Sequence, residues 1–166
     1  MEQEILEYLR SHYFGKYRGT VARNDDPTSR GRLQVKVPRF GGLEMWAMPC
    51  VPYAGPKVGF YSLPPVGAGV WVEFEAGDLS FPIWTGCFWA DGELPDDGGA
   101  DVKIWQTDSL TLRLDDAEDQ LLLQNSAESK TTYGDTVTTE CGDAVVKVGD
   151  NGGTSVTINE DAFEVS

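Results

Sequence analysis

The pattern of hydrophobic and polar positions divides the chain into parts of different character, and the first is helical. In residues 2–14, Ile5, Leu9 and Tyr13 lie four positions apart, which places them on one face of a predicted helix. Gly15 follows where such a helix would end. A helix this short is marginal alone, so its apolar face is expected to dock either on its own chain or on a neighbouring protein.

Residues 16–93 are predicted to form a compact β domain. Short segments rich in β-branched and aromatic residues alternate with turns built from Asn, Asp, Gly and Pro. The predicted strands are Tyr17–Arg23, Arg32–Val37, Met45–Val51, Gly69–Glu75 and Ile83–Trp89. Five short strands in a segment of this length favour a small Greek-key barrel such as an OB-fold.

The composition changes after a Pro-, Gly- and Asp-rich linker at residues 94–101. Residues 102–166 contain no proline and consist of short alternating runs separated by polar turns. The runs are Leu110–Leu114, Leu121–Leu123, Thr136–Thr138, Val145–Val148, Val156–Ile158 and Phe163–Val165. Their regular spacing is typical of a β-sandwich or a β-solenoid, and the absence of proline fits continuous strand ladders.

This last part has too few large apolar residues to fold alone. Ordering each residue costs about 1.5 kcal/mol of conformational entropy, whereas burying a large apolar side chain returns roughly 1.5–3 kcal/mol. Identical chains wound together would cover the apolar stripes and pair the strand edges. We therefore predict an obligate homo-oligomeric β-prism, with a monomeric β-sandwich as the alternative. The positions expected to face its axis include Val146, Val148, Val156 and Ile158.

The net charge of −14 over 166 residues is concentrated in the C-terminal part. Residues 1–93 carry 9 basic and 11 acidic side chains, whereas residues 94–166 carry 4 basic and 16 acidic ones. Such a chain repels phosphate backbones and anionic lipids, so nucleic acid is not an expected partner. No apolar run is long enough for a membrane helix, and the N-terminus lacks the features of a signal peptide. We expect assembly in the cytoplasm.

The acidic residues and cysteines considered for catalysis or metal binding do not form a recognisable active-site motif. Asp96-Asp97 and Asp115-Asp116 fall in the linker or at a turn, where solvated carboxylates are expected. Cys50 and Cys87 lie in apolar runs and are predicted to be buried free thiols, while Cys141 has no CxxC partner. We predict no enzymatic activity, no cofactor and no metal.

Several segments resemble a known family. The stretches Tyr17–Val21, Asn24–Pro27 and Gly31–Pro38 resemble the opening of the OB domain of phage baseplate spike proteins. That family includes baseplate assembly protein V, the VgrG spikes of type VI secretion and the spikes of phage-tail-like particles. The similarity continues through Trp46–Gly55, Gly59–Pro64, Val66–Asp78 and Pro82–Gly86. The similarity is close over residues 16–93. The acidic remainder shares only the repetitive character of the family's β-helix.

The resemblance implies an all-β spike with a mechanical function. Its parts would be a helix at 1–15, an OB-fold at 16–93, a linker at 94–101 and an intertwined trimeric β-helix at 102–166. A homotrimer would sit below a trimeric baseplate hub, and contraction of the sheath would drive it through a target envelope. Contact with a membrane would then be by puncture alone.

The resemblance also implies partners at both ends of the spike. We expect Ile5, Leu9 and Tyr13 to contact the hub. The only histidine is His12, so the chain lacks the His-x-His metal apex of some relatives. A PAAR-like tip protein would then cover the other end, with contacts from Phe163, Val165 and Ser166.

Two other function classes fit parts of the pattern. A carbohydrate-binding or carbohydrate-active tail protein is one, because trimeric β-prisms also occur in phage fibres. An OB-fold that binds nucleic acid would use Trp71, Trp84 and Trp89 as stacking platforms. These tryptophans lie among apolar residues and are predicted to belong to the barrel core instead.

Overall fold

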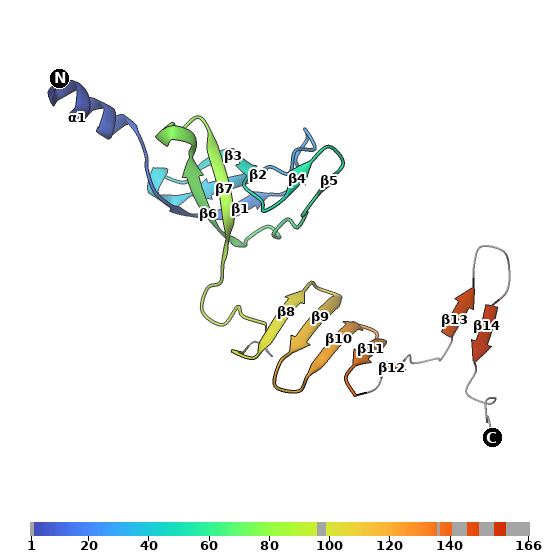
Figure 1. The fold of residues 1–166 in the computed structure, drawn as a ribbon. Helices are drawn as coiled ribbons and strands as arrows, with labels where there is room; N and C mark the ends of the chain where they lie inside the picture. The colour runs from blue at the N-terminus through green and yellow to red at the C-terminus, as the bar shows by residue number, and fades with distance from the viewer. Residues whose placement is uncertain (1, 96–98, 136, 141–145, 150–154, 159–166) are drawn as a thin grey trace. The chain divides into compact units, whose positions relative to one another are not determined.

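The chain forms two compact units, Met1–Glu93 and Leu94–Ser166. The computed structural model (Figure 1) describes residues 2–95, 99–135, 137–140, 146–149 and 155–158. Each unit is described by itself below. No described helix has the length and apolar character needed to cross a membrane.

The first unit contains a closed five-stranded barrel. Its strands are β1 (Tyr17–Arg23), β2 (Leu33–Val37), β3 (Leu43–Pro49), β6 (Gly69–Phe74) and β7 (Pro82–Phe88). They follow one another around the barrel in the order β1-β2-β3-β7-β6. Neighbours are antiparallel except β3 and β7, which pair in parallel. The predicted OB-like barrel is confirmed, and each predicted strand lies within two residues of an observed one.

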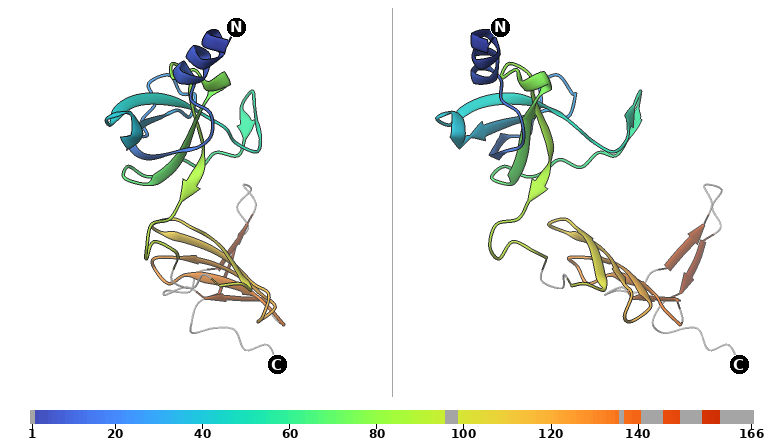
Figure 2. Two further views of the ribbon diagram at one scale, coloured as in Figure 1. Left: turned by 90° about the vertical axis from the view of Figure 1, so that its left-hand side faces the viewer. Right: turned by 60° about the vertical axis from the view of Figure 1, so that its left-hand side comes forward.

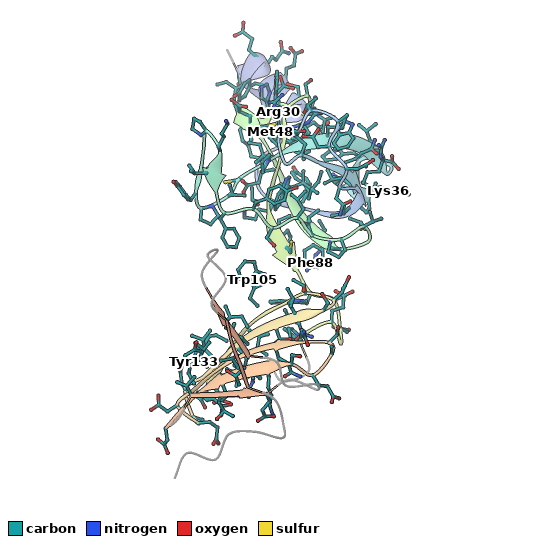
Figure 3. All side chains as sticks on the ribbon, turned by 90° about the vertical axis from the view of Figure 1, so that its right-hand side faces the viewer. Arg30, Lys36, Met48, Phe88, Trp105 and Tyr133 are labelled. Carbon is teal, nitrogen blue, oxygen red and sulfur yellow. The ribbon has the colours of Figure 1, made fainter. Side chains whose placement is uncertain are left out.

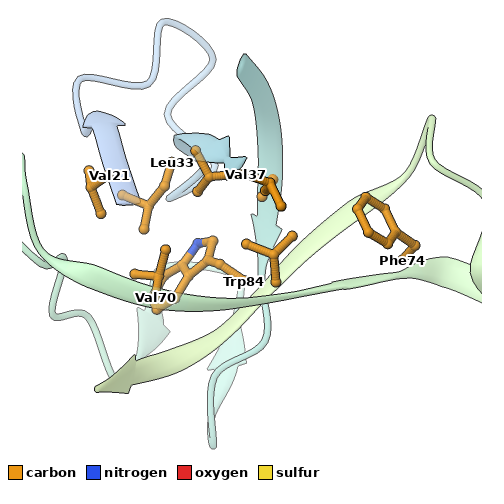
Figure 4. Close-up of a cluster of buried hydrophobic side chains, with 9 residues drawn as sticks. Val21, Leu33, Val37, Val70, Phe74 and Trp84 are labelled. Carbon is orange, nitrogen blue, oxygen red and sulfur yellow. The ribbon is translucent and has the colours of Figure 1, made fainter. Parts of the chain in front are cut away.

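Alternating side chains of these strands fill the barrel (Figure 4). In β2, Leu33, Val35 and Val37 are fully buried, whereas Lys36 points to solvent. This period of two is what the pleat of a strand imposes. The buried hydrophobic residues are Val21, Leu33, Val35, Val37, Ala47, Val70, Val72, Phe74 and Trp84.

The N-terminal helix is shorter than its apolar spacing suggests. Helix α1 spans Glu2–Ser11 and has no buried residue. Tyr13 lies beyond it, where its backbone N–H donates to the Gly77 carbonyl at 2.8 Å. Its ring packs against Phe40 with 4.9 Å between the ring centres. Tyr13, in the segment that connects α1 to the barrel, therefore packs on the barrel, whereas the apolar face of α1 stays exposed.

Short elements connect the barrel strands. Two single 3₁₀ turns, η1 (Pro38–Phe40) and η2 (Glu75–Gly77), follow β2 and β6. Strands β4 (Ala54–Gly55) and β5 (Val58–Gly59) pair only with each other and form a small separate hairpin. Residues 52–62, which we call the arm, are all exposed. Figure 2 shows the hairpin projecting from the barrel.

The second unit contains an antiparallel meander and a hairpin. The meander consists of β8 (Val102–Gln106), β9 (Leu110–Asp115), β10 (Gln120–Asn125), β11 (Lys130–Tyr133) and β12 (Val137–Glu140). The hairpin pairs β13 (Val146–Gly149) with β14 (Ser155–Ile158). Five of the six predicted runs overlap these strands, β8 and β11 were not predicted, and the run Phe163–Val165 lies outside the described residues. A single chain thus shows a sheet and a hairpin, and the trimeric β-helix stays a prediction.

Candidate assembly surfaces

The five-stranded sheet of the second unit has one apolar face. Residues directly opposite in neighbouring strands point to the same side of a sheet. The register pairs Trp105 with Leu112, Leu112 with Leu123, and Tyr133 with Val137. The large hydrophobic residues of this face, which we call the apolar face, are Trp105, Leu110, Leu112, Leu114, Leu121, Leu123, Tyr133 and Val137. Lys103, Asn125, Thr131 and Thr139 lie on the same face.

Most of this apolar face is open to solvent. Every exposed large hydrophobic residue of the sheet lies on it, from Leu123 and Tyr133 at 44% exposure to Val137 at 65%. A shallow groove of about 430 Å³ runs between Trp105, Leu110 and Leu123; Figure 3 shows the side chains of this sheet. An exposed apolar surface of this kind is typical of an interaction site.

The opposite face of the same sheet is mainly polar, although Ile104 and Leu122 also lie on it. It carries an ion pair between Arg113 and Asp115, at 2.7 Å, and another between Lys130 and Glu140, at 2.9 Å. Asp115 is only 6% exposed, and its Oδ1 accepts hydrogen bonds from the backbone N–H groups of Ala117 and Glu118. The prediction of a solvated Asp115 was therefore wrong, because this carboxylate organises the β9–β10 turn. The sheet is amphipathic, so only one of its faces needs a partner.

The predicted needle-core residues occupy matched positions in the β13–β14 hairpin. Val146 lies directly opposite Ile158, and Val148 lies opposite Val156. Residues at such positions share a face of a hairpin. The backbone register thus brings together the four residues that the sequence grouped.

The predicted partner-binding residues are not all brought together. Ile5 and Leu9 are 55% and 56% exposed on α1, as a docking face requires. Tyr13 instead belongs to the aromatic cluster of Tyr17, Phe40 and Phe74 at one end of the barrel. Sequence spacing placed it on the helix because nothing local signals that α1 ends at Ser11. The predicted tip residues Phe163, Val165 and Ser166 lie outside the described residues.

A buried ion pair organises the loop between β1 and β2, and the sequence gave no sign of it. Asp26 Oδ1 accepts from Arg32 Nε at 3.0 Å and Nη2 at 2.8 Å. The backbone N–H groups of Thr28 and Arg30 also donate to this carboxylate. The Asp26 side chain is 4% exposed, and the Arg32 guanidinium lies 5.1 Å from the centre of the Trp46 ring. The Arg32 hydrogen bonds hold the pKa of Asp26 well below its usual range.

The tryptophans do not form a stacking platform for bases. Trp84 is buried in the core as predicted, but the prediction was wrong for Trp71 and Trp89. Trp71 lies on the outside of the barrel, where the Arg18 guanidinium covers its ring at 5.0 Å and Phe88 packs beside it. Trp89 is 65% exposed beyond the end of β7. The available ring faces are therefore scattered or already covered.

Within the described ranges, the cysteines singled out from the sequence are free thiols, and the aspartates belong to ion pairs. Cys50 and Cys87 are free but exposed, so the prediction that they are buried was wrong. Asp116 pairs with Lys103, and Asp96 and Asp97 lie outside the described residues. Across the part of the chain that the structure describes, no cluster of three His, Cys, Asp or Glu residues is placed to hold a metal ion.

Comparison with known proteins identifies the barrel. Residues 17–89 match the family model described as the type VI secretion system/phage-baseplate injector OB domain. The match spans all five barrel strands, the Asp26 loop and the arm. No curated protein matches the chain.

Proposed function

Because residues 17–89 belong to the injector OB-domain family, we propose that this protein is the central spike of a contractile injection system. The barrel would form the collar below the baseplate hub, and three copies of the second unit would wind into a needle. The function is mechanical rather than catalytic. The observation that carries this proposal is the exposed apolar face of the β8–β12 sheet.

Assembly around an axis would bury that face. Three copies can turn their leucines and Trp105 inward, where burial stabilises each large side chain by roughly 1.5–3 kcal/mol. The polar face, with its Arg113–Asp115 and Lys130–Glu140 pairs, would then face water. The matched positions Val146, Val148, Val156 and Ile158 would continue the apolar interior. The outer edges of β8 and β12 would gain partners as well.

The two ends would bind different proteins. The exposed face of α1, with Ile5 and Leu9, is proposed to contact a trimeric hub. Tyr13 would contribute indirectly, by fixing the base of the helix to Gly77. The end of the needle, including Phe163, Val165 and Ser166, is proposed to bind a PAAR-like tip protein.

Two truncations test this orientation. Deleting residues 160–166 should abolish binding of the tip protein and leave hub binding and trimer formation intact. Deleting residues 1–11, which removes α1 but keeps Tyr13, should abolish hub binding alone. Co-purification of each variant with the hub and tip proteins of the same particle measures both effects. The proposed orientation would be wrong if deleting residues 160–166 abolished hub binding and deleting residues 1–11 abolished binding of the tip protein.

A further inference from the structure

The arm presents four large hydrophobic side chains to solvent within a short segment of the first unit. Tyr53, Val58, Phe60 and Tyr61 are 59%, 53%, 50% and 75% exposed. The hairpin that carries them has only two residues in each strand. A two-stranded hairpin is marginally stable in water, so the arm is expected to be completed by another chain.

A groove of about 470 Å³ lies between the arm and the barrel. Tyr53 and Phe60 line it from the arm, and Trp84 lines its base from the barrel. Arg30 and Lys57 are its charged residues, and no acidic residue lines it. The groove is therefore cationic although the chain as a whole is acidic. Its charge is complementary to a carboxylate-bearing ligand.

Both cations have capacity for a further ligand. Arg30 Nη2 donates to the Met48 thioether sulfur at 3.1 Å, and a thioether is a weak acceptor (Figure 3). Lys57 makes no ion pair with any residue of the described ranges and is exposed at the tip of the hairpin. Its φ of +61° lies in the left-handed region, which glycine adopts with less strain.

We propose that this groove binds an acidic, extended segment of a partner protein that also carries apolar side chains. The arm hairpin is a sheet of its own, so β4 and β5 each have one edge that is not paired with a third strand. An extended segment can add to such an edge, with alternate side chains directed to the groove. Its carboxylates would pair with Lys57 and Arg30, and its apolar side chains would pack on the exposed rings of Tyr53 and Phe60. This binding is independent of how the needle assembles.

The test uses the full-length protein and a fluorescent synthetic peptide in which glutamate alternates with phenylalanine and valine. Fluorescence polarisation should show saturable binding that weakens with added salt. A matched peptide with glutamine in place of glutamate should bind at least about tenfold more weakly, because it cannot pair with Lys57 and Arg30. Absence of saturable binding by the acidic peptide, or equal binding by both peptides, would overturn the proposal.

Variants of the groove locate the binding site. Lys57→Gly removes the charge and relieves the left-handed strain, so it preserves the fold. Combined with Arg30→Gln, it should weaken binding by about tenfold or more, because charge-assisted hydrogen bonds are lost. Lys57→Arg should bind like the native protein. So should Lys36→Gln, which removes an exposed cation of β2 that does not line the groove. Equal losses in the Lys36 and Lys57 variants would assign the effect to net charge and contradict the proposal.

Discussion

The guanidinium of Arg32 holds the buried carboxylate of Asp26 through two hydrogen bonds, from Nε at 3.0 Å and from Nη2 at 2.8 Å. The pair closes the loop between β1 and β2, and Trp46 packs on the guanidinium. The loop in turn supplies Arg30 to the groove beside the arm. One ion pair therefore connects the stability of the barrel to the shape of a proposed binding surface.

Replacing Asp26 by Asn should destabilise the barrel strongly. The variant keeps the shape of the side chain but leaves the half-buried Arg32 without a counter-ion, and breaking such a pair is costly. We expect the melting temperature to fall by more than about 5 °C in calorimetry. Asp25→Asn is the control, because Asp25 pairs with Arg23 at the exposed surface. An equal effect of the two substitutions would contradict the organising role of Asp26.

The contribution of Asp26 should also depend on pH. Because its pKa is lowered by folding, the stabilisation is fully present above the unfolded pKa of about 3.9. It is lost as the pH falls below that value towards the folded pKa. The difference in melting temperature between the native protein and Asp26→Asn should therefore be constant near neutral pH and shrink below about pH 4. A difference that grows in acid would show that another group is responsible.

A charge on the apolar face of the β8–β12 sheet should prevent assembly. Leu123→Asp would place copies of one carboxylate together in the proposed dry interior, so light scattering should show a loss of the trimer. Thr138→Asp, an exposed position of β12 opposite Thr132, lies on the polar face outside the groove of this sheet and should leave the mass unchanged. If both variants assemble like the native protein, the apolar face is not the interface.

The β13–β14 hairpin offers a second, separate test of the needle. Ile158→Asp should lower the thermal resistance of the assembly, because Ile158 is a proposed core position opposite Val146. Thr157→Asp, opposite Lys147, is its neighbour on the other face and should have little effect. The two unfolding curves, recorded by circular dichroism, should differ clearly; identical curves would remove Ile158 from the core.

Gly77 should be essential for anchoring the N-terminal helix. It adopts a φ of +83°, and a Cβ atom there would lie 2.9 Å from Phe14 Cε1 and 3.0 Å from His12 Cβ. Gly77→Ala should therefore cost about 1–3 kcal/mol of unfolding free energy and displace the segment that carries Tyr13. Affinity for the hub should fall while the trimer remains, as measured by co-purification and light scattering. Unchanged hub binding would show that the anchor does not position α1.

The barrel could be predicted from sequence because its signals are local. The alternation Leu33-Gln34-Val35-Lys36-Val37 fixes which side of β2 is buried, and the turn residues between strands fix where each strand ends. The same reasoning failed where a contact between residues far apart in the sequence determines the local structure. Tyr13 continues the helical spacing, yet its packing on Phe40 and Phe74 takes it out of the helix.

The candidate surfaces were harder to predict for a similar reason. Asp26 sits in a stretch with strong turn signals, and its partner Arg32 follows six residues later across the loop. The arm contains Gly55, Pro56 and Gly59, which indicate turns. For this reason its two very short strands were not predicted from the sequence. In the second unit, alternation in Leu110–Leu114 identified an apolar face correctly. We propose that other chains cover that face, and a single sequence does not contain such a contact.

The central proposal, a spike made from three copies, is tested most directly by the mass of the purified full-length protein in solution. Analytical ultracentrifugation at micromolar concentration should give three times the chain mass of 18.2 kDa, with no dissociation on dilution or in moderate salt. A mass of 18.2 kDa under the same conditions would contradict it, because the apolar face of the β8–β12 sheet would then remain exposed in the native protein.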